Sequence, residues 1–138
     1  MSDLLSPALR DFVRLRAGRV CEYCRLHEED CRLSHEPDHV IARKHRGETT
    51  LDNLAWTCFA CNRHKGTDIA SIDRKTGKIV RLFNPRQDTW KMHFRLLAGR
   101  IVPRTPQGRV TEFLLHFNHP MRIRIRLDLI RARRYPRE

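Results

Sequence analysis

CEYC (residues 21–24) and CFAC (residues 58–61) are two Cys-x-x-Cys turns, and 33 residues lie between them. Such a turn presents two sulfur atoms on one side of a tight bend, and two turns supply the four thiolates of a tetrahedral zinc site. We therefore expect Cys21, Cys24, Cys58 and Cys61 to bind one structural zinc ion. Because the spacing exceeds that of an ordinary zinc ribbon, we expect a further structure to be built inside this clamp.

The segment inside the clamp contains the residue types that phosphodiester hydrolysis requires. Asp38 and His39 are adjacent, Asn53 follows in the next predicted strand region, and Asn62 comes directly after the last cysteine. A histidine with a pKa near neutrality can take a proton from water. A divalent ion on oxygen ligands can neutralise the phosphate and stabilise the leaving oxygen. Adjacent side chains on a strand point to opposite sides, so we expect the carboxylate to face a metal ion and the imidazole to face the water.

Local signals inside the clamp predict the order strand, loop, strand, helix. Residues 34–41 read as extended, because Pro37 disfavours a helix at the residue before it and the segment ends in two strand formers. Residues 43–50 form a basic loop, and a second strand leads into CFAC. A short helix is expected over 61–65, ending near Gly66.

Three motifs in this order carry a resemblance to a known family. DHVI (38–41), LDNL (51–54) and CFACNRHKG (58–66) resemble the HNH endonuclease family in its zinc-knuckle subtype. The resemblance covers roughly residues 18–68. It implies a small ββα-metal nuclease unit, in which a two-stranded hairpin and a helix hold a single divalent ion.

The resemblance also implies a role for each matching residue. His39 would be the general base, and Asp38 a ligand of the catalytic ion. Asn53 would order the hairpin loop and help to orient His39, and Asn62 would be the second metal ligand. One carboxylate and one neutral amide form an oxygen-only site, which suits Mg²⁺ or Mn²⁺ better than a catalytic zinc ion.

Four basic side chains lie near these residues in the sequence and are candidates for contact with nucleic acid. They are Arg43 and Lys44 in the loop, and His64 and Lys65 in the helix. For each of them alone, ordinary solvent exposure is the competing interpretation.

The ends of the chain are expected to cover this unit. Ser6 and Pro7 are start signals for a helix over 8–17, and Cys31 reads as a spare thiol outside the metal site. The fold class is therefore α+β. We expect one domain over 1–138, in which a ββα-metal unit (18–68) clamped by a four-cysteine zinc site follows an N-terminal helix. A mixed α/β extension (69–138) packs on that unit.

The extension gives weaker signals. Turn residues between Ile72 and Ile79 predict a hairpin, and a helix is expected over 110–117. Residues 121–130 alternate apolar residues with arginine, which fits a strand, yet their apolar residues also fit one helical face, and we favour a helix. Trp90, Phe94 and Phe113 are expected in the core. Arg122, Arg124 and Arg126 fit either a phosphate track or solvated surface.

Charge favours a polyanionic partner. The formal net charge is +12, because residues 39–138 hold 22 Lys and Arg against eight Asp and Glu, a net of +14, whereas residues 1–38 have a net of −2. DNA is the expected partner, RNA remains open, and no membrane partner is expected. The sequence shows no signal peptide and no apolar run of transmembrane length, and its paired cysteines suit a reducing compartment, so we expect a cytoplasmic protein.

Three functional interpretations follow. The first is a divalent-metal-dependent DNA endonuclease, the second a zinc-ribbon module that binds nucleic acid without cutting it, and the third a zinc-clamped protein-interaction domain. The clamp and the charge fit both of the first two. A binding module does not need Asp38, His39, Asn53 and Asn62 together, so we favour the nuclease. A single site cuts one strand per engagement, so double-strand cutting would need a homodimer.

Overall fold

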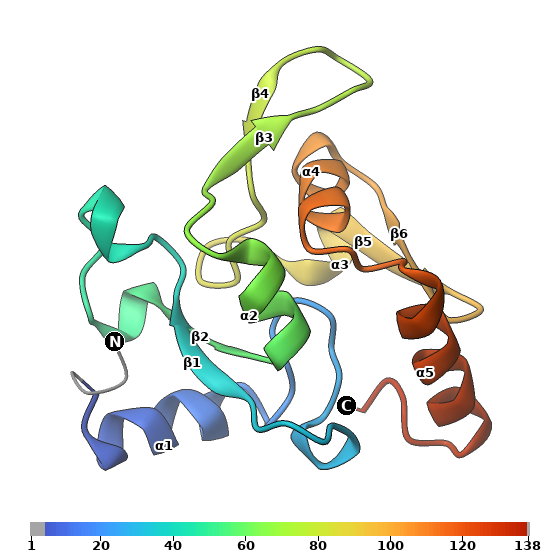
Figure 1. The fold of residues 1–138 in the computed structure, drawn as a ribbon, viewed down its shortest axis with the longest axis horizontal. Helices are drawn as coiled ribbons and strands as arrows, with labels where there is room; N and C mark the ends of the chain where they lie inside the picture. Colours follow the sequence, from blue (N-terminus) through green and yellow to red (C-terminus); the bar gives the residue numbers. More distant parts are fainter. Residues whose placement is uncertain (1–4, 138) are drawn as a thin grey trace.

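The computed structural model describes residues 5–137, in which six strands form three separate antiparallel hairpins flanked by helices (Figure 1). The helices are α1 (Pro7–Arg16), α2 (Phe59–Lys65), α3 (Trp90–His93), α4 (Pro106–Leu114) and α5 (Pro120–Arg131). The strands are β1 (Glu36–His39), β2 (Leu54–Thr57), β3 (Ala70–Ile72), β4 (Ile79–Arg81), β5 (Phe94–Leu97) and β6 (Arg100–Pro103). Three short 3₁₀ turns are η2 (Glu28–Asp30), η3 (Arg43–His45) and η4 (Leu51–Asn53). The predicted α+β class is confirmed, and none of the described helices has the length and apolar character needed to cross a membrane.

The ββα arrangement is present inside the cysteine clamp. β1 pairs with β2 so that Asp38 lies opposite Ala55 and His39 opposite Leu54. α2 follows β2 directly, because Cys58 caps the helix by accepting a hydrogen bond from the amide of Cys61 on its Sγ at 3.4 Å. The residues between the strands form the long loop that contains η3 and η4.

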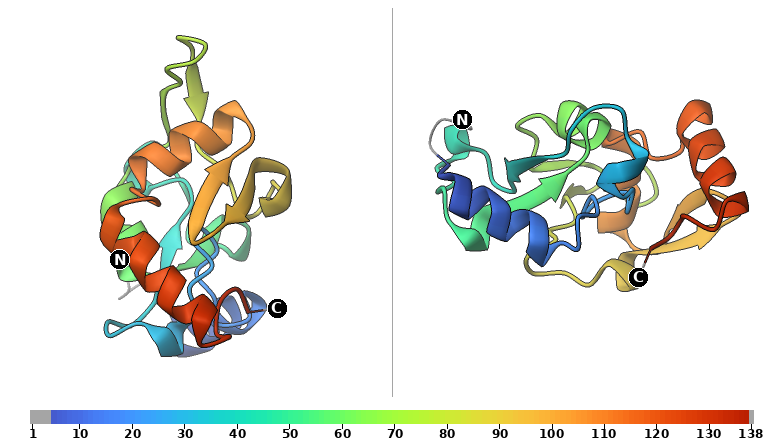
Figure 2. Two further views of the ribbon diagram at one scale, coloured as in Figure 1. Left: turned by 90° about the vertical axis from the view of Figure 1, so that its right-hand side faces the viewer. Right: turned by 90° about the horizontal axis from the view of Figure 1, so that it is seen from below.

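α1 supports the hairpin from outside. Its predicted start is confirmed, since Ser6 Oγ accepts from the amide of Leu9 at 3.1 Å and proline occupies the first helical position. Val13 on the inner face is fully buried and packs with Leu54 and Trp56 of β2. This small second core fixes one side of the β1–β2 hairpin. The ribbon of α1 lies beside that hairpin (Figure 2, right).

The extension confirms two predictions and corrects a third. β3 and β4 form the predicted hairpin, with Ile72 opposite Ile79, and residues 120–131 are helical. The helix expected over 110–117 begins earlier, at Pro106. Thr105 Oγ1 caps it by accepting from the amide of Gly108 at 3.0 Å, a start signal inside the segment interpreted as a loop.

The main core joins the extension to the cysteine turns. Phe94 is 1% exposed, and its ring contacts the rings of Trp90, Phe83 and Phe117. The same core includes all four paired cysteines. Trp90 and Phe94 are core residues as predicted, whereas Phe113 is 63% exposed on the outer face of α4, so that prediction was wrong.

Candidate active site

The four paired cysteines converge on one point in the core. Their Sγ atoms all lie within 4.8 Å of one another, and Cys24 and Cys58 approach to 3.6 Å. Tetrahedral zinc with bonds of about 2.3 Å places its sulfur ligands about 3.8 Å apart. Burial raises the pKa of the Cys21 and Cys61 thiols well above the usual value, so four thiolates need a cation to share this space. The donor set and its spacing are those of a structural zinc site.

Cys31 lies apart from the cluster, as predicted for a spare thiol. It is partly exposed, and it is not among the four cysteines that could hold an ion. Burial raises the pKa of the Cys31 thiol to about 12, so this side chain stays protonated near neutral pH.

β1 directs the two side chains of the Asp-His pair toward different neighbours. Asp38 turns toward α2, where its Oδ2 lies 3.4 Å from Nζ of Lys65. His39 turns toward the loop, where its Nε2 lies 2.8 Å from Oγ1 of Thr49. The alternation of side chains along a strand accounts for this separation.

Asn53 closes the loop that follows β1. Its Oδ1 accepts from the amide of Ile41 at 2.9 Å, and its Nδ2 donates to the carbonyl oxygens of Ile41 and Glu48, each at 2.9 Å. Gly47 is required for this closure, because a Cβ there would lie 1.7 Å from the carbonyl oxygen of Ile41. The loop therefore has one fixed path from His39 to Thr49.

The model of the HNH endonuclease family matches residues 21–68. This segment belongs to the HNH endonuclease family. The match begins at the first cysteine of the clamp, ends just after α2, and leaves the extension outside it. No significant match was found among curated proteins or among solved structures.

Within the HNH segment, Lys65 lies where the sequence did not predict it. It was expected to contact nucleic acid, yet it is 1% exposed. Its Nζ donates to the carbonyl oxygen of His39 at 3.1 Å in addition to its ion pair with Asp38. Lys65 is therefore directed into the protein, because the face of α2 that carries it packs against β1.

Asn62 lies three residues before Lys65, on the same face of α2 and one turn closer to the clamp. It is half-buried, and its side chain makes no hydrogen bond within residues 5–137. On β1, Asp38 Oδ2 is buried, and its one neighbour recorded among the described residues is Lys65 Nζ in the ion pair at 3.4 Å, with no hydrogen bond that satisfies it. A buried carboxylate oxygen held only by an ion pair and an amide that makes no side-chain hydrogen bond are the kinds of oxygen ligand that Mg²⁺ or Mn²⁺ prefers.

Burial shifts the pKa values of Asp38 and His39 in opposite directions. Burial lowers the pKa of His39 below its usual value of 6.5, an effect that Asp38 opposes and Arg43 reinforces. Burial raises the pKa of Asp38 above its usual value of 3.8, and Lys65 counteracts that rise. The neutral form of the imidazole is thus favoured near pH 7.

Thr49 is a site residue that the sequence analysis missed. Its hydroxyl bonds His39 Nε2 and also accepts from Arg43 Nη1 at 3.1 Å, so it links the histidine to the basic loop. No motif marks Thr49, and only the closure of the loop by Asn53 brings it to His39.

The remaining basic candidates are exposed. Arg43 and Lys44 lie in η3 on the surface, and His64 lies exposed on α2. The ring of His64 stacks on that of His116, with centroids 4.2 Å apart. These three side chains remain accessible to a partner, in contrast to Lys65.

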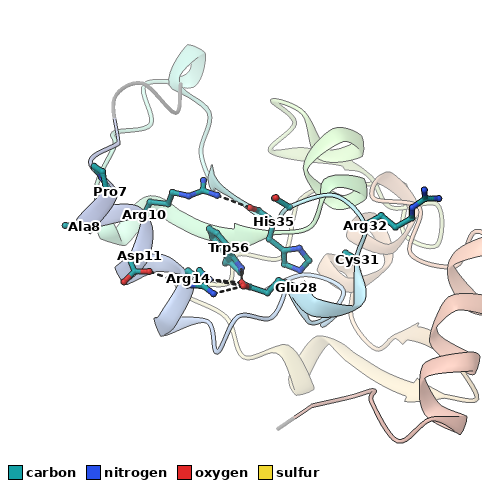
Figure 3. Close-up of a pocket in the computed structure, with 11 residues that line it drawn as sticks. Pro7, Ala8, Arg10, Asp11, Arg14, Glu28, Cys31, Arg32, His35 and Trp56 are labelled. Carbon is teal, nitrogen blue, oxygen red and sulfur yellow. Dashed lines mark hydrogen bonds and ion pairs between the residues drawn. The ribbon is translucent and has the colours of Figure 1, made fainter.

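A separate cavity of about 730 Å³ lies between α1 and the segment that precedes β1 (Figure 3). Two of its arginines are already in ion pairs, since Arg14 binds Glu28 of the lining and Arg10 binds Glu36 outside it. None of the HNH motif residues lines it. This cavity is therefore distinct from the site at the end of β1.

Residues of the extension contact the cysteine cluster. Arg122 of α5 is 8% exposed, and its Nη2 donates to Cys61 Sγ at 3.2 Å. Tyr135 donates its hydroxyl to the carbonyl of Cys24 at 2.8 Å. Arg126 is fully buried and donates to the carbonyl of Gly99 at 2.6 Å. Neither arginine lies on a phosphate track or on solvated surface, so both interpretations of these two residues were wrong.

Proposed function

We propose that the protein is a divalent-metal-dependent endonuclease that hydrolyses phosphodiester bonds of DNA, with His39 as general base. The observation that carries this proposal is the arrangement at the end of β1. Within a segment of the HNH endonuclease family, a buried carboxylate faces α2 and an imidazole that favours its neutral form faces the loop. A module that only binds nucleic acid does not need a carboxylate and a neutral imidazole that face different sides of one strand.

Asp38 and Asn62 would hold the catalytic Mg²⁺ or Mn²⁺. When bound, the ion supplies positive charge that neutralises the scissile phosphate and stabilises the leaving oxygen. Lys65 has a different part from the one expected. Its ammonium favours the ionised form of Asp38 and holds that carboxylate on the α2 side of the strand.

His39 takes the proton from the attacking water. In the tautomer whose Nε2–H donates to Thr49 Oγ1, which also accepts from Arg43, Nδ1 is the unprotonated ring nitrogen and accepts this proton. Asn53 acts as a positioning residue, because it fixes the loop that carries Thr49. The family resemblance implies products with 5′-phosphate and 3′-hydroxyl ends.

Exposed basic groups around the site hold the nucleic acid. Arg43 and Lys44 of η3 and His64 of α2 are exposed and accessible to backbone phosphates, in line with the net charge of +12. Double-strand cutting requires two copies of the chain. Four unoxidised thiols around one zinc site suit a reducing compartment such as the cytoplasm.

Cleavage of supercoiled plasmid tests the proposal. We expect the zinc-loaded protein to nick the plasmid when Mg²⁺ or Mn²⁺ is added and to leave it intact when the ion is omitted. Salt-sensitive retention of the plasmid without cutting under either condition would instead support the zinc-ribbon binding module.

A further inference from the structure

The β3–β4 hairpin projects away from the rest of the protein (Figure 1; Figure 2, left). Its turn, residues 73–78, carries Arg74, Lys75 and Lys78, which are all exposed. None of these three side chains has an ion-pair or hydrogen-bond partner in the part of the chain that the structure describes. The tip is therefore a source of uncompensated positive charge.

The one acidic residue of the turn does not reduce that charge. Asp73 is 1% exposed and receives two hydrogen bonds from Arg109 of α4, at 2.8 and 3.0 Å. Thr76 Oγ1 donates to the same carboxylate at 2.8 Å. The pairing with Arg109 holds the pKa of Asp73 well below its usual range. Asp73 thus joins the turn to α4 as a rigid unit, and the residues left outside are basic.

Below the basic turn, the hairpin exposes a pair of large apolar side chains. Ile72 and Ile79 are cross-strand partners on one face, and they are 61% and 78% exposed. A groove of about 900 Å³ runs from this region to α4, where Phe113 is also exposed. An exposed apolar pair beneath a basic tip marks a surface that a partner covers.

The dimensions of the hairpin fit the major groove of duplex DNA. That groove admits a two-stranded β-ribbon and is about 8.5 Å deep. Each strand advances about 3.3 Å per residue, so the three-residue strands with their turn are long enough to reach the base edges. The methyl group of thymine in this groove is a natural contact for an isoleucine side chain.

The base of the hairpin adjoins the HNH site. Ile69 and Arg81, at its two ends, line a small pocket together with Val40, Ile41 and Lys65. Val40 directly follows His39. The basic turn η3 and the β3–β4 hairpin are separate projections of the chain (Figure 1). A duplex that contacts both η3 and the hairpin therefore passes the end of β1.

We propose that the β3–β4 hairpin enters the major groove of duplex DNA beside the cleavage site. Arg74, Lys75 and Lys78 contact the backbone, and Ile72 and Ile79 contact base edges. This inference rests on the proposed function only in taking DNA as the partner, and it makes the hairpin the element that sets affinity and base preference.

Binding of a labelled duplex by fluorescence anisotropy tests the inference. All variants are made in the His39→Ala background without added divalent ion, so that cleavage does not interfere. The charge variant is Arg74→Ala/Lys75→Ala/Lys78→Ala. Its control, Arg95→Ala/Arg124→Ala/Arg131→Ala, removes the same charge from exposed positions outside the hairpin. The apolar variant is Ile72→Thr/Ile79→Thr, which keeps β-branched residues in both strands.

The charge variant is expected to lose affinity and to lower the slope of log K against log salt by about 2–3, since each phosphate contact contributes about 0.9. The matched control keeps the slope of the parent. The apolar variant is expected to keep that slope but to lose about tenfold in affinity for a T-rich duplex, a loss within the range of one base contact. Thermal unfolding confirms that each variant is folded.

Equal slopes for the charge variant and its control would overturn the inference. A normal affinity of the apolar variant would overturn it as well, and a shift of that variant from dimer to monomer would assign the isoleucine pair to a second copy of the chain. These outcomes are separate from the proposed function. If the protein cuts DNA but the hairpin variants bind normally, only the inference about the hairpin is refuted. If the hairpin is needed for binding but the protein never cuts DNA, only the proposed nuclease function is refuted.

Discussion

Nζ of Lys65 lies 3.4 Å from Oδ2 of Asp38 and 3.1 Å from the carbonyl oxygen of His39. One buried ammonium therefore contacts both residues of the Asp-His pair. It supplies positive charge to the carboxylate that we propose as a metal ligand. This relationship connects the folding of α2 onto β1 with the chemistry at the end of the strand.

Replacing Lys65 by methionine should reveal this connection. Breaking a buried pair on one side costs about 3 kcal/mol, so the zinc-loaded Lys65→Met protein should unfold at a lower temperature than wild type. Added Mn²⁺ should then raise the melting temperature of the variant more than that of wild type, because the ion replaces the missing charge beside Asp38. Arg63→Met, at an exposed position of the same helix, is the control. An equal rise in melting temperature for Lys65→Met and wild type on addition of Mn²⁺ would contradict the assignment of Asp38 as a metal ligand.

Replacing Asn53 by alanine should open the loop. The change removes three hydrogen bonds to backbone groups, and at about 1 kcal/mol each the free energy of unfolding should fall by about 3 kcal/mol. Amide hydrogen exchange of residues 41–49 should also become faster. Asp52→Ala at the exposed neighbouring position should change neither quantity. Unchanged exchange in Asn53→Ala would show that the loop is held by other contacts.

The pH dependence of cleavage should follow His39. The base acts in its neutral form, and burial lowers its pKa below 6.5, so the imidazole is neutral at pH 7. Cleavage should therefore decline as the pH falls through a midpoint below 6.5.

Thr49→Val should reduce kcat by about tenfold, part of the 10²–10⁴ that a general base contributes, and should move the midpoint of this pH profile. Thr50→Val is the control. A midpoint above 6.5, or one that Thr49→Val does not move, would contradict the role given to this pair.

The zinc site should depend on Arg122. A guanidinium that donates to Cys61 Sγ offsets the negative charge of four thiolates around a divalent ion. We expect Arg122→Met to release zinc to a colorimetric chelator several-fold faster than wild type. Arg124→Met, with a side chain that is 71% exposed on the same helix, should behave as wild type. Equal release rates for the two variants would show that Arg122 does not stabilise the bound zinc, and that its role is to bind the carbonyl groups of the α4–α5 connection.

Local patterns predicted the parts of the fold that depend on short-range chemistry. The Cys-x-x-Cys spacing predicted the cluster, the Ser6-Pro7 pair the start of α1, and turn residues the β3–β4 hairpin. Each of these signals acts within a few residues, so it can be recognised without knowledge of the tertiary structure.

The errors concern residues whose environment is set by packing between distant elements. Lys65 follows two other basic residues, and only the docking of α2 on β1 turns it inward. Arg122 and Arg126 alternate with apolar residues and so read as surface, yet they lie four residues apart on one helical face, and that face is the buried one. The i, i+4 spacing was the signal available in the sequence. No sequence signal marked Thr49, because the loop that brings it to His39 is closed by the hydrogen bonds of Asn53 to Ile41 and Glu48.

The most direct test of the central claim compares wild type with His39→Ala in plasmid cleavage. Both proteins are first matched in zinc content and in affinity for duplex DNA, and Mg²⁺ or Mn²⁺ is then added or withheld. We predict that wild type converts supercoiled plasmid to nicked product only with the added ion. We predict that His39→Ala binds the DNA normally but loses cleavage by at least about 10²-fold. Cleavage by His39→Ala at the wild-type rate would contradict the assignment of His39 as the general base.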